Sequence, residues 1–174
     1  VEITHAFVTH THPDHVGGRF ANVEIPGVDE LLSRCDAKVV VHKAEVEALK
    51  GLAASDVIKA ESGDKIDVGG IEIQLLHTPG HTPGSQCFLV DGRIVSGDTL
   101  FIDACGRVDF PGGNAEQMYY SLTQKLMALP DDTILFPGHN YAAEPQATMA
   151  EQKKTNPYLK FASLKQFLAA MGYR

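Results

Sequence analysis

The chain has 174 residues, a length typical of one domain with an ordinary hydrophobic core, and we treat residues 1–174 as a single domain. Hydrophobic residues make up 44% and charged residues 21%, and there is no run of about 18 apolar residues that would suggest a membrane span. The net charge of -7, with scattered lysines and arginines, argues against nucleic acid as the main partner.

Three cysteines, Cys35, Cys87 and Cys105, lie far apart and form no C-x-x-C pair. This spacing is typical of reduced, buried thiols and not of a disulfide framework. The N-terminal stretch VEITHAFVTHTHPDHVGGRF has neither a basic start nor an uninterrupted apolar segment, so it does not resemble a signal peptide. We therefore expect a cytoplasmic protein without a membrane partner.

The first half of the chain predicts strands with two short helices between them. Apolar patterns predict strands at residues 1–9, 38–42, 71–77, 86–90 and 93–97. The helices are expected at residues 29–35, with Asp29 as N-cap, and at 43–50, ending at Gly51. Asp91-Gly92 between the last two strands is a typical hairpin turn, so these strands should pair.

The second half contains the clearest helix, at about residues 115–129. Apolar residues recur there at helical spacing, and Pro130 closes the pattern: Met118, Leu122, Leu126 and Leu129. Met118 is therefore expected in the core and not as a cofactor ligand. A strand at 133–139 and helices at 145–153 and 163–171 complete a mixed α/β (α+β) chain, in which each unusual polar motif follows a predicted strand.

The most unusual of these motifs is T-H-T-H-P-D-H at residues 9–15. In an extended segment the side chains of His10 and His12 point the same way, so both can hold one metal ion. Pro13 disfavours a helical conformation at His12 and turns the chain, after which Asp14 and His15 can face a second point nearby. The alternative is a polar loop that is rich in imidazole by coincidence.

Three later residues can supply the remaining ligands of such a site. His81, Asp98 and His139 each follow a predicted strand, and each has a glycine directly before it that permits a tight turn. Taken alone, each is more simply a turn or cap residue. A metal held by H-x-H-x-D-H needs further ligands, however, and this favours a metal-binding role for the three residues. The resulting five histidines and two aspartates suffice for two ions that share one carboxylate.

The remaining histidines lack such support. His5, His42 and His77 are outside the motifs, and we expect them to have a structural role. Histidine and aspartate ligands suit zinc, iron and manganese alike. We expect two divalent ions, with zinc as the first candidate and iron or manganese as alternatives.

Four motifs in this order, T-H-T-H-P-D-H, T-P-G-H-T-P-G-S, S-G-D-T-L-F and P-G-H-N-Y, resemble the metal-binding motifs of the metallo-β-lactamase fold superfamily. The segments G-D-T-L-F-I-D-A-C-G-R-V-D-F-P-G-G (97–113) and E-Q-K-K-T-N-P-Y-L (151–159) are similar to the glyoxalase II and persulfide dioxygenase branch, which acts on glutathione-linked sulfur compounds. The resemblance implies an αββα sandwich.

The resemblance also implies a role for each motif residue. The first metal would be bound by His10, His12 and His81, and the second by Asp14, His15 and His139. Asp98 would bridge the two ions. Arg107 matches the basic residue that binds the glycine carboxylate of glutathione in glyoxalase II, although a plain salt bridge explains it equally well.

The sequence departs from glyoxalase II at three places. Asp109 stands where that enzyme has an aromatic residue, and the larger C-terminal helical domain is not present in this sequence. Family members have several strands before H-x-H-x-D-H, whereas here the motif begins at His10. We therefore expect a sandwich that lacks its N-terminal strands, and exposed sheet edges would favour a homo-oligomer.

These features lead to one main hypothesis and two alternatives. The main hypothesis is a dinuclear hydrolase, similar to hydroxyacylglutathione hydrolase, in which a metal-bridging hydroxide attacks a small thioester or ester while Asp14 and Asp98 position it. The first alternative is a mononuclear iron persulfide dioxygenase with His10, His81 and Asp98 as ligands. The second is a non-catalytic metal-binding protein.

Overall fold

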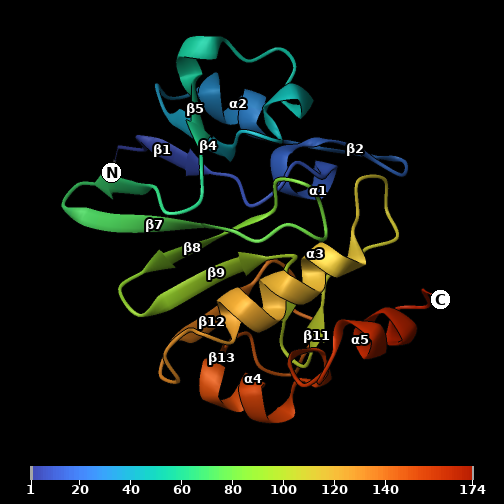
Figure 1. Cartoon of the computed structure of the whole chain (residues 1–174). Coiled ribbons are helices and arrows are strands. Elements are labelled where there is room, and N and C mark those ends of the chain that lie inside the picture. Colours follow the sequence, from blue (N-terminus) through green and yellow to red (C-terminus); the bar gives the residue numbers. More distant parts are fainter. Residues whose placement is uncertain (1, 174) are drawn as a thin grey trace.

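The computed structural model describes residues 2–173, and its two main β-sheets face each other, with helices on their outer sides (Figure 1). This is the αββα arrangement that the sequence resemblance predicted. The short helix α2 (Val28–Leu32) covers one sheet, and the C-terminal helices cover the other. Val1 and Arg174 lie outside the described residues.

The larger sheet has six strands in the order β13-β12-β9-β8-β7-β6. Its strands are β6 (Lys65–Val68), β7 (Ile71–His77), β8 (Gln86–Val90), β9 (Arg93–Gly97), β12 (Ile134–Pro137) and β13 (Ala147–Thr148). Strands β6 to β9 pair antiparallel in chain order, and β12 joins β9 in parallel. Asp91 and Gly92 both have positive φ, which confirms the predicted hairpin turn between β8 and β9.

The smaller sheet consists of three parallel strands in the order β1-β4-β5. These are β1 (His5–Phe7), β4 (Lys38–His42) and β5 (Val57–Ala60). Strand β4 lies in the middle, and three successive valines at 39–41 are completely buried, because helices cover one face and the larger sheet covers the other. Between the two sheets pack Val40, Ala60, Leu75 and Phe88.

The outer face of the larger sheet is covered by helices α3 (Ala115–Tyr120), α4 (Met149–Thr155) and α5 (Leu164–Ala170). Helix α3 continues as a π-helical segment, η3 (Ser121–Leu126). Met118, Leu122 and Leu126 are fully buried in this core, as their helical spacing predicted. Their burial supplies the apolar contact that holds the helical layer on the sheet.

Short elements complete the described chain. They are α1 (Pro13–Val16), the hairpins β2 (Gly18–Phe20) with β3 (Val23–Ile25) and β10 (Leu100–Phe101) with β11 (Ala104–Cys105), and the 3-10 turns η1 (Val46–Ala48), η2 (Ala54–Asp56) and η4 (Pro157–Leu159). Neither hairpin was predicted from the sequence, because the strands are too short to establish a hydrophobic period.

Several predicted boundaries were wrong. The helix expected at 43–50 is only the turn η1, because the side chain of Glu45 is drawn into the protein and hydrogen-bonded there. The helix expected at 145–153 begins at Met149, because residues 147–148 form a strand that pairs with β12. Thr148 is the N-cap of the helix and forms a capping box with Glu151. The strand expected at 1–9 is limited to β1, and strands β5 and β6 were missed.

A stacked pair of imidazoles connects the two sheets. The rings of His42 on β4 and His77 on β7 lie 3.8 Å apart between centroids, at an interplanar angle of 8°. His42 Nδ1 accepts a hydrogen bond from the Ala44 N–H (3.3 Å), and His77 Nε2 donates to the Pro83 carbonyl (2.9 Å). The ring stacking and these hydrogen bonds support the structural role predicted for His42 and His77.

This pair predicts a loss of stability at acidic pH. Burial, together with the neighbouring His77, lowers the pKa of His42 from 6.5 to about 4. Because the unfolded chain takes up this proton at higher pH than the folded chain, stability declines as pH falls from 6.5 to 4 and levels off below. We expect His42 to contribute a loss of about 2 kcal/mol between pH 7 and 5.

Urea unfolding of the metal-free protein at pH 7 and pH 5 would measure this loss. His42→Phe keeps a flat ring in the stack and removes the titrating group, so its stability should depend less on pH than that of the wild type. His5→Phe, on neighbouring β1, is the matched control and should keep the full dependence. An equal pH dependence in the wild type and His42→Phe would contradict the assignment.

Candidate metal centre

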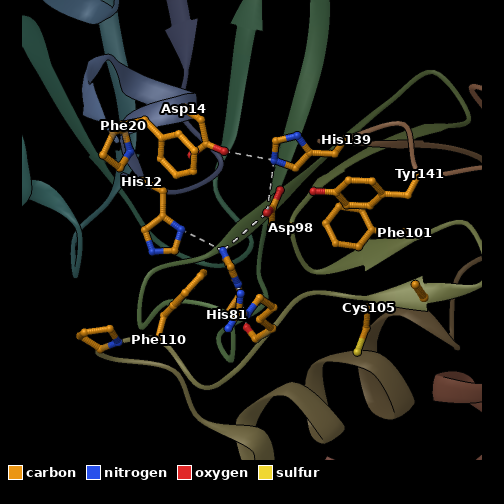
Figure 2. Close-up of a pocket in the computed structure, with 14 residues that line it drawn as sticks. His12, Asp14, Phe20, His81, Asp98, Phe101, Cys105, Phe110, His139 and Tyr141 are labelled. Carbon is orange, nitrogen blue, oxygen red and sulfur yellow. Dashed lines mark hydrogen bonds and ion pairs between the residues drawn. The ribbon is translucent and has the colours of Figure 1, made fainter. Parts of the chain in front are cut away.

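Seven polar side chains from four segments of the sequence meet at one edge of the sandwich, where several strands end. Figure 2 shows His12, Asp14, His81, Asp98 and His139 among them. They come from the segment that runs from β1 into α1, and from the loops after β7, β9 and β12. They are all seven of the predicted ligands: His10, His12, Asp14, His15, His81, Asp98 and His139.

The first group of ligand atoms consists of three imidazole nitrogens. His12 Nδ1 lies 3.1 Å from His10 Nε2 and 2.9 Å from His81 Nε2. His10 is buried, with 1% of its surface exposed, whereas His12 and His81 line a cavity. Three nitrogens that converge in this way can hold one metal ion.

The second group consists of two imidazoles and a carboxylate. His139 Nε2 lies 3.2 Å from His15 Nε2 and 3.3 Å from Asp14 Oδ2. Asp14 and His15 sit on the first turn of α1, where Pro13 begins the helix. The turn at Pro13 therefore directs His12 toward the first group and Asp14 toward the second.

Asp98 lies between the two groups. Its Oδ2 is 3.6 Å from His81 Nε2 and 3.5 Å from His139 Nε2, as Figure 2 shows by the convergence of these side chains. Its Oδ1 is buried and, among the described residues, accepts no hydrogen bond of suitable geometry, although His15 Nε2 is 3.3 Å away. A buried carboxylate oxygen without a donor is costly, and a cation would satisfy it.

The charge states of these groups also suit a divalent metal. Burial, together with the neighbouring His15, lowers the pKa of His10 to about 2, so the imidazole is neutral and has a free lone pair. Burial alone would raise the pKa of Asp98, but His15 and His10 outweigh it and hold the pKa below its usual range. Neutral imidazoles and an ionised carboxylate are the forms that bind metal.

Hydrogen bonds and glycines around the ligands hold them in place. His81 Nδ1 donates to the Arg107 carbonyl (2.7 Å), which leaves Nε2 free to bind metal. A Cβ on Gly138 would lie 2.6 Å from Asp98 Oδ1, so this position next to His139 excludes any larger residue. The register of β12 against β9 shifts at Pro137, directly before this glycine, and bends the chain toward the site.

The loop that carries His81 is hydrogen-bonded to the π-helical segment η3. Ser121 Oγ donates to the Pro79 carbonyl (2.7 Å), and Lys125 Nζ donates to the His77 carbonyl (2.5 Å). A π-helical turn changes the direction in which successive side chains point, which brings both donors onto one loop. Neither donor was predicted from the sequence, because a serine or lysine in an amphipathic helix gives no local indication that it bonds to a distant loop.

Arg107 lies on the wall of the cavity beside this centre and forms an ion pair. Its Nε and Nη2 donate to the two carboxylate oxygens of Asp109 at 2.9 and 2.7 Å. The ring of Phe110 lies 4.2 Å below the guanidinium carbon. The salt bridge that was one explanation of Arg107 is therefore present, and Arg107 is also among the residues that line the cavity.

The cavity has a volume of about 620 Å³, and five of the predicted ligands line it. Its other walls are mostly apolar, and the aromatic residues among them were not recognised from the sequence: Phe20, Phe101, Phe110 and Tyr141 (Figure 2). The Phe110 ring packs edge-on against His12, and Tyr141 stacks on His139. A small molecule that enters this cavity would therefore contact aromatic rings directly beside the metal ligands.

Comparison with known proteins identifies the superfamily of this chain and several of its relatives. Residues 1–139 match the family described as the metallo-beta-lactamase superfamily. The chain belongs to this superfamily. Human "Persulfide dioxygenase ETHE1, mitochondrial" is 31% identical over 99% of this chain and 62% of that protein. "Probable metallo-hydrolase YqgX" of Bacillus subtilis is 30% identical over 90% of this chain and 76% of that protein.

Solved structures of the superfamily agree with the fold. ETHE1 from Myxococcus xanthus superposes with a TM-score of 0.81 and 36% identity over 99% of this chain and 69% of that chain. The di-iron-bound form of TTHA1623 has a TM-score of 0.69 and 32% identity over 88% and 76% of the two chains. The predicted superfamily and fold class are thus confirmed. The chain spans 62% of the length of the curated ETHE1 proteins.

The superfamily assignment agrees with two further findings. Among residues 2–173, no helix is both long and apolar enough to cross a membrane. The relatives include both persulfide dioxygenases and metallo-hydrolases, which is consistent with the branch that the C-G-R segment suggested. The superfamily also supports an enzyme that binds divalent metal.

The position of Asp98 predicts that metal binding depends on it. Asp98→Asn removes the charge and one oxygen ligand, so we expect metal affinity to fall at least tenfold, by about 1.4 kcal/mol or more. Added metal should raise the melting temperature of the wild type and raise that of the variant much less. Asp91→Asn in the exposed hairpin is the control, and elemental analysis after dialysis measures the bound metal. Full metal content in Asp98→Asn would contradict the prediction.

Proposed function

We propose that this protein is an iron-dependent persulfide dioxygenase that acts on a small-molecule persulfide. The observation that carries the proposal is that His10 shares one ligand group with His81 and another with Asp98, whose Oδ2 lies 3.6 Å from His81 Nε2, beside an apolar cavity. Such a two-histidine, one-carboxylate face is typical of iron oxygenases. Similarity to the ETHE1 proteins over almost the whole chain supports it.

The residues of the chain have distinct tasks in this proposal. Iron held by this face would supply one-electron and oxygen chemistry. The protein holds His10 neutral in a buried position and orients His81 through the Arg107 carbonyl. The aromatic walls restrict access of water to the cavity, and the Arg107 guanidinium can attract a substrate carboxylate such as that of glutathione, in competition with Asp109.

A dinuclear hydrolase for a thioester or ester is the second candidate. The observation in its favour is the second ligand group, in which Asp14, His15 and His139 are complete and share Asp98 with the first group. Metallo-hydrolase relatives and the di-iron form of TTHA1623 support it. Here Asp14 and Asp98 would hold two ions, with zinc, iron or manganese as candidates, and would position the attacking water.

Metal content and activity, measured on the same preparation, distinguish the two. The dioxygenase requires one iron per chain and oxygen consumption that depends on added glutathione persulfide. The hydrolase requires two metals per chain and cleavage of a glutathione thioester without oxygen consumption. Metal binding with neither activity would support a non-catalytic metal-binding protein and would contradict both proposals.

A pair of variants sharpens this test. His81→Asn removes a ligand that both candidates require, so it should abolish either activity. His139→Asn removes a ligand of the second group only. It should reduce a dioxygenase activity much less than His81→Asn does, whereas it should reduce a hydrolase activity by at least about a hundredfold. Equal loss of oxygen consumption in both variants would argue against the mononuclear site.

The cellular location and the oligomeric state remain predictions. Cys35, Cys87 and Cys105 are free thiols, which supports a reducing compartment such as the cytoplasm. The names of the human and bovine relatives place those proteins in mitochondria. We propose a small-molecule substrate in either compartment, with no role for nucleic acid or a membrane.

A further inference from the structure

Glu45 is a buried carboxylate next to the metal centre that belongs to neither ligand group. It follows strand β4 of the smaller sheet, and only 5% of its surface is exposed. Glutamate is rarely this buried unless it is paired or has a task. Among the described residues it forms no ion pair with a lysine or arginine, so hydrogen-bond donors must compensate for the burial of its charge.

These donors come from both loops that carry ligands of the first group. The Thr11 N–H donates to Glu45 Oε2 (3.2 Å), and the Thr11 hydroxyl donates to the same oxygen. The Gly84 N–H donates to Oε1 (2.8 Å). Thr11 lies between His10 and His12, and Gly84 follows His81 by three positions. One side chain therefore connects the two loops that must meet at the metal.

The fit of Glu45 between the loops is tight. A Cβ on Gly84 would lie 2.3 Å from Glu45 Cγ, so the space is already filled by the glutamate. Burial alone would raise the pKa of Glu45, but the hydrogen bonds from Thr11, Thr82 and Gly84 outweigh it and keep the pKa below its usual range. The site thus has a fixed negative charge behind three imidazoles.

A neutral side chain could tie the two loops together without the cost of burying a charge. A cation held by His10, His12 and His81 would instead interact favourably with an ionised carboxylate that is hydrogen-bonded to the segment between two of its ligands. Thr11 also lies between His10 and His12, whose side chains point the same way in an extended segment, so a bond that fixes its N–H helps to fix the direction of both imidazoles. Charge and position together favour a function in metal binding over a purely structural one.

We propose that Glu45 is a positioning residue for the first metal group, which aligns the His10 to His12 segment with the His81 loop and adds a favourable negative charge. The proposal rests on the metal-binding part of the proposed function and holds for either reaction. It predicts that Glu45 acts on metal affinity and on ligand geometry, without contact with the substrate.

The test is a titration of metal-free protein with Co²⁺, followed by visible absorption, which reports both affinity and ligand geometry. Glu45→Gln keeps the shape and loses the charge and one acceptor, so we expect the affinity to fall about tenfold or more and the spectrum to change. Glu61→Gln is the matched control, because it removes the same charge at an exposed ion pair with Lys43 and should leave affinity and spectrum unchanged.

The outcomes separate this proposal from its alternatives. A lower melting temperature of metal-free Glu45→Gln with wild-type cobalt affinity and spectrum would show a purely structural tie and overturn the proposal. Absence of cobalt binding in the wild type would instead overturn the metal site itself. If Glu45→Gln does not fold, Thr11→Val removes only the hydroxyl donor. It should weaken cobalt binding in the same direction, and unchanged affinity there would also overturn the proposal.

Discussion

The structure depends on holding together side chains whose lone pairs face one another. Five imidazoles and two carboxylates meet at one edge of the sandwich, and several of their nitrogen and oxygen atoms lie 2.9 to 3.6 Å apart. Such a group does not assemble through its own attraction, because it is partly buried and Asp98 Oδ1 has no donor among the described residues. The scaffold must supply the energy that keeps it in place until a cation binds.

The scaffold does this by bringing several rigid strand ends to one place. Two sheets pack face to face through an apolar interface, and loops from both sheets reach the same edge. Each loop is then fixed by polar contacts with another element. Ser121 and Lys125 hydrogen-bond to the end of β7 and the loop after it, and Glu45, which follows strand β4, hydrogen-bonds to both that loop and the H-x-H segment. The site is preorganised because its supports come from separate layers.

The cavity adds selectivity to this metal centre. Aromatic rings pack directly against His12 and His139, so a substrate at the metal would also contact apolar surface. The single arginine among the residues that line the cavity is already paired with Asp109. The centre offers two ligand groups, and its relatives include both persulfide dioxygenases and metallo-hydrolases, so the fold alone does not decide the reaction.

The sequence by itself identified the seven side chains that come together at the centre, the superfamily fold and much of the secondary structure. Alternation in H-x-H, the Asp91-Gly92 turn and the helical spacing of Met118 and Leu122 are local patterns, and local patterns are what a single sequence records. The contacts of Glu45, Lys125 and Tyr141 were decided only by the tertiary structure, because their partners lie far away along the chain. The wrongly predicted helix at 43–50 has the same cause. Its residues have helical propensity, but long-range hydrogen bonds from Thr11 and Gly84 to Glu45 hold the segment in a turn.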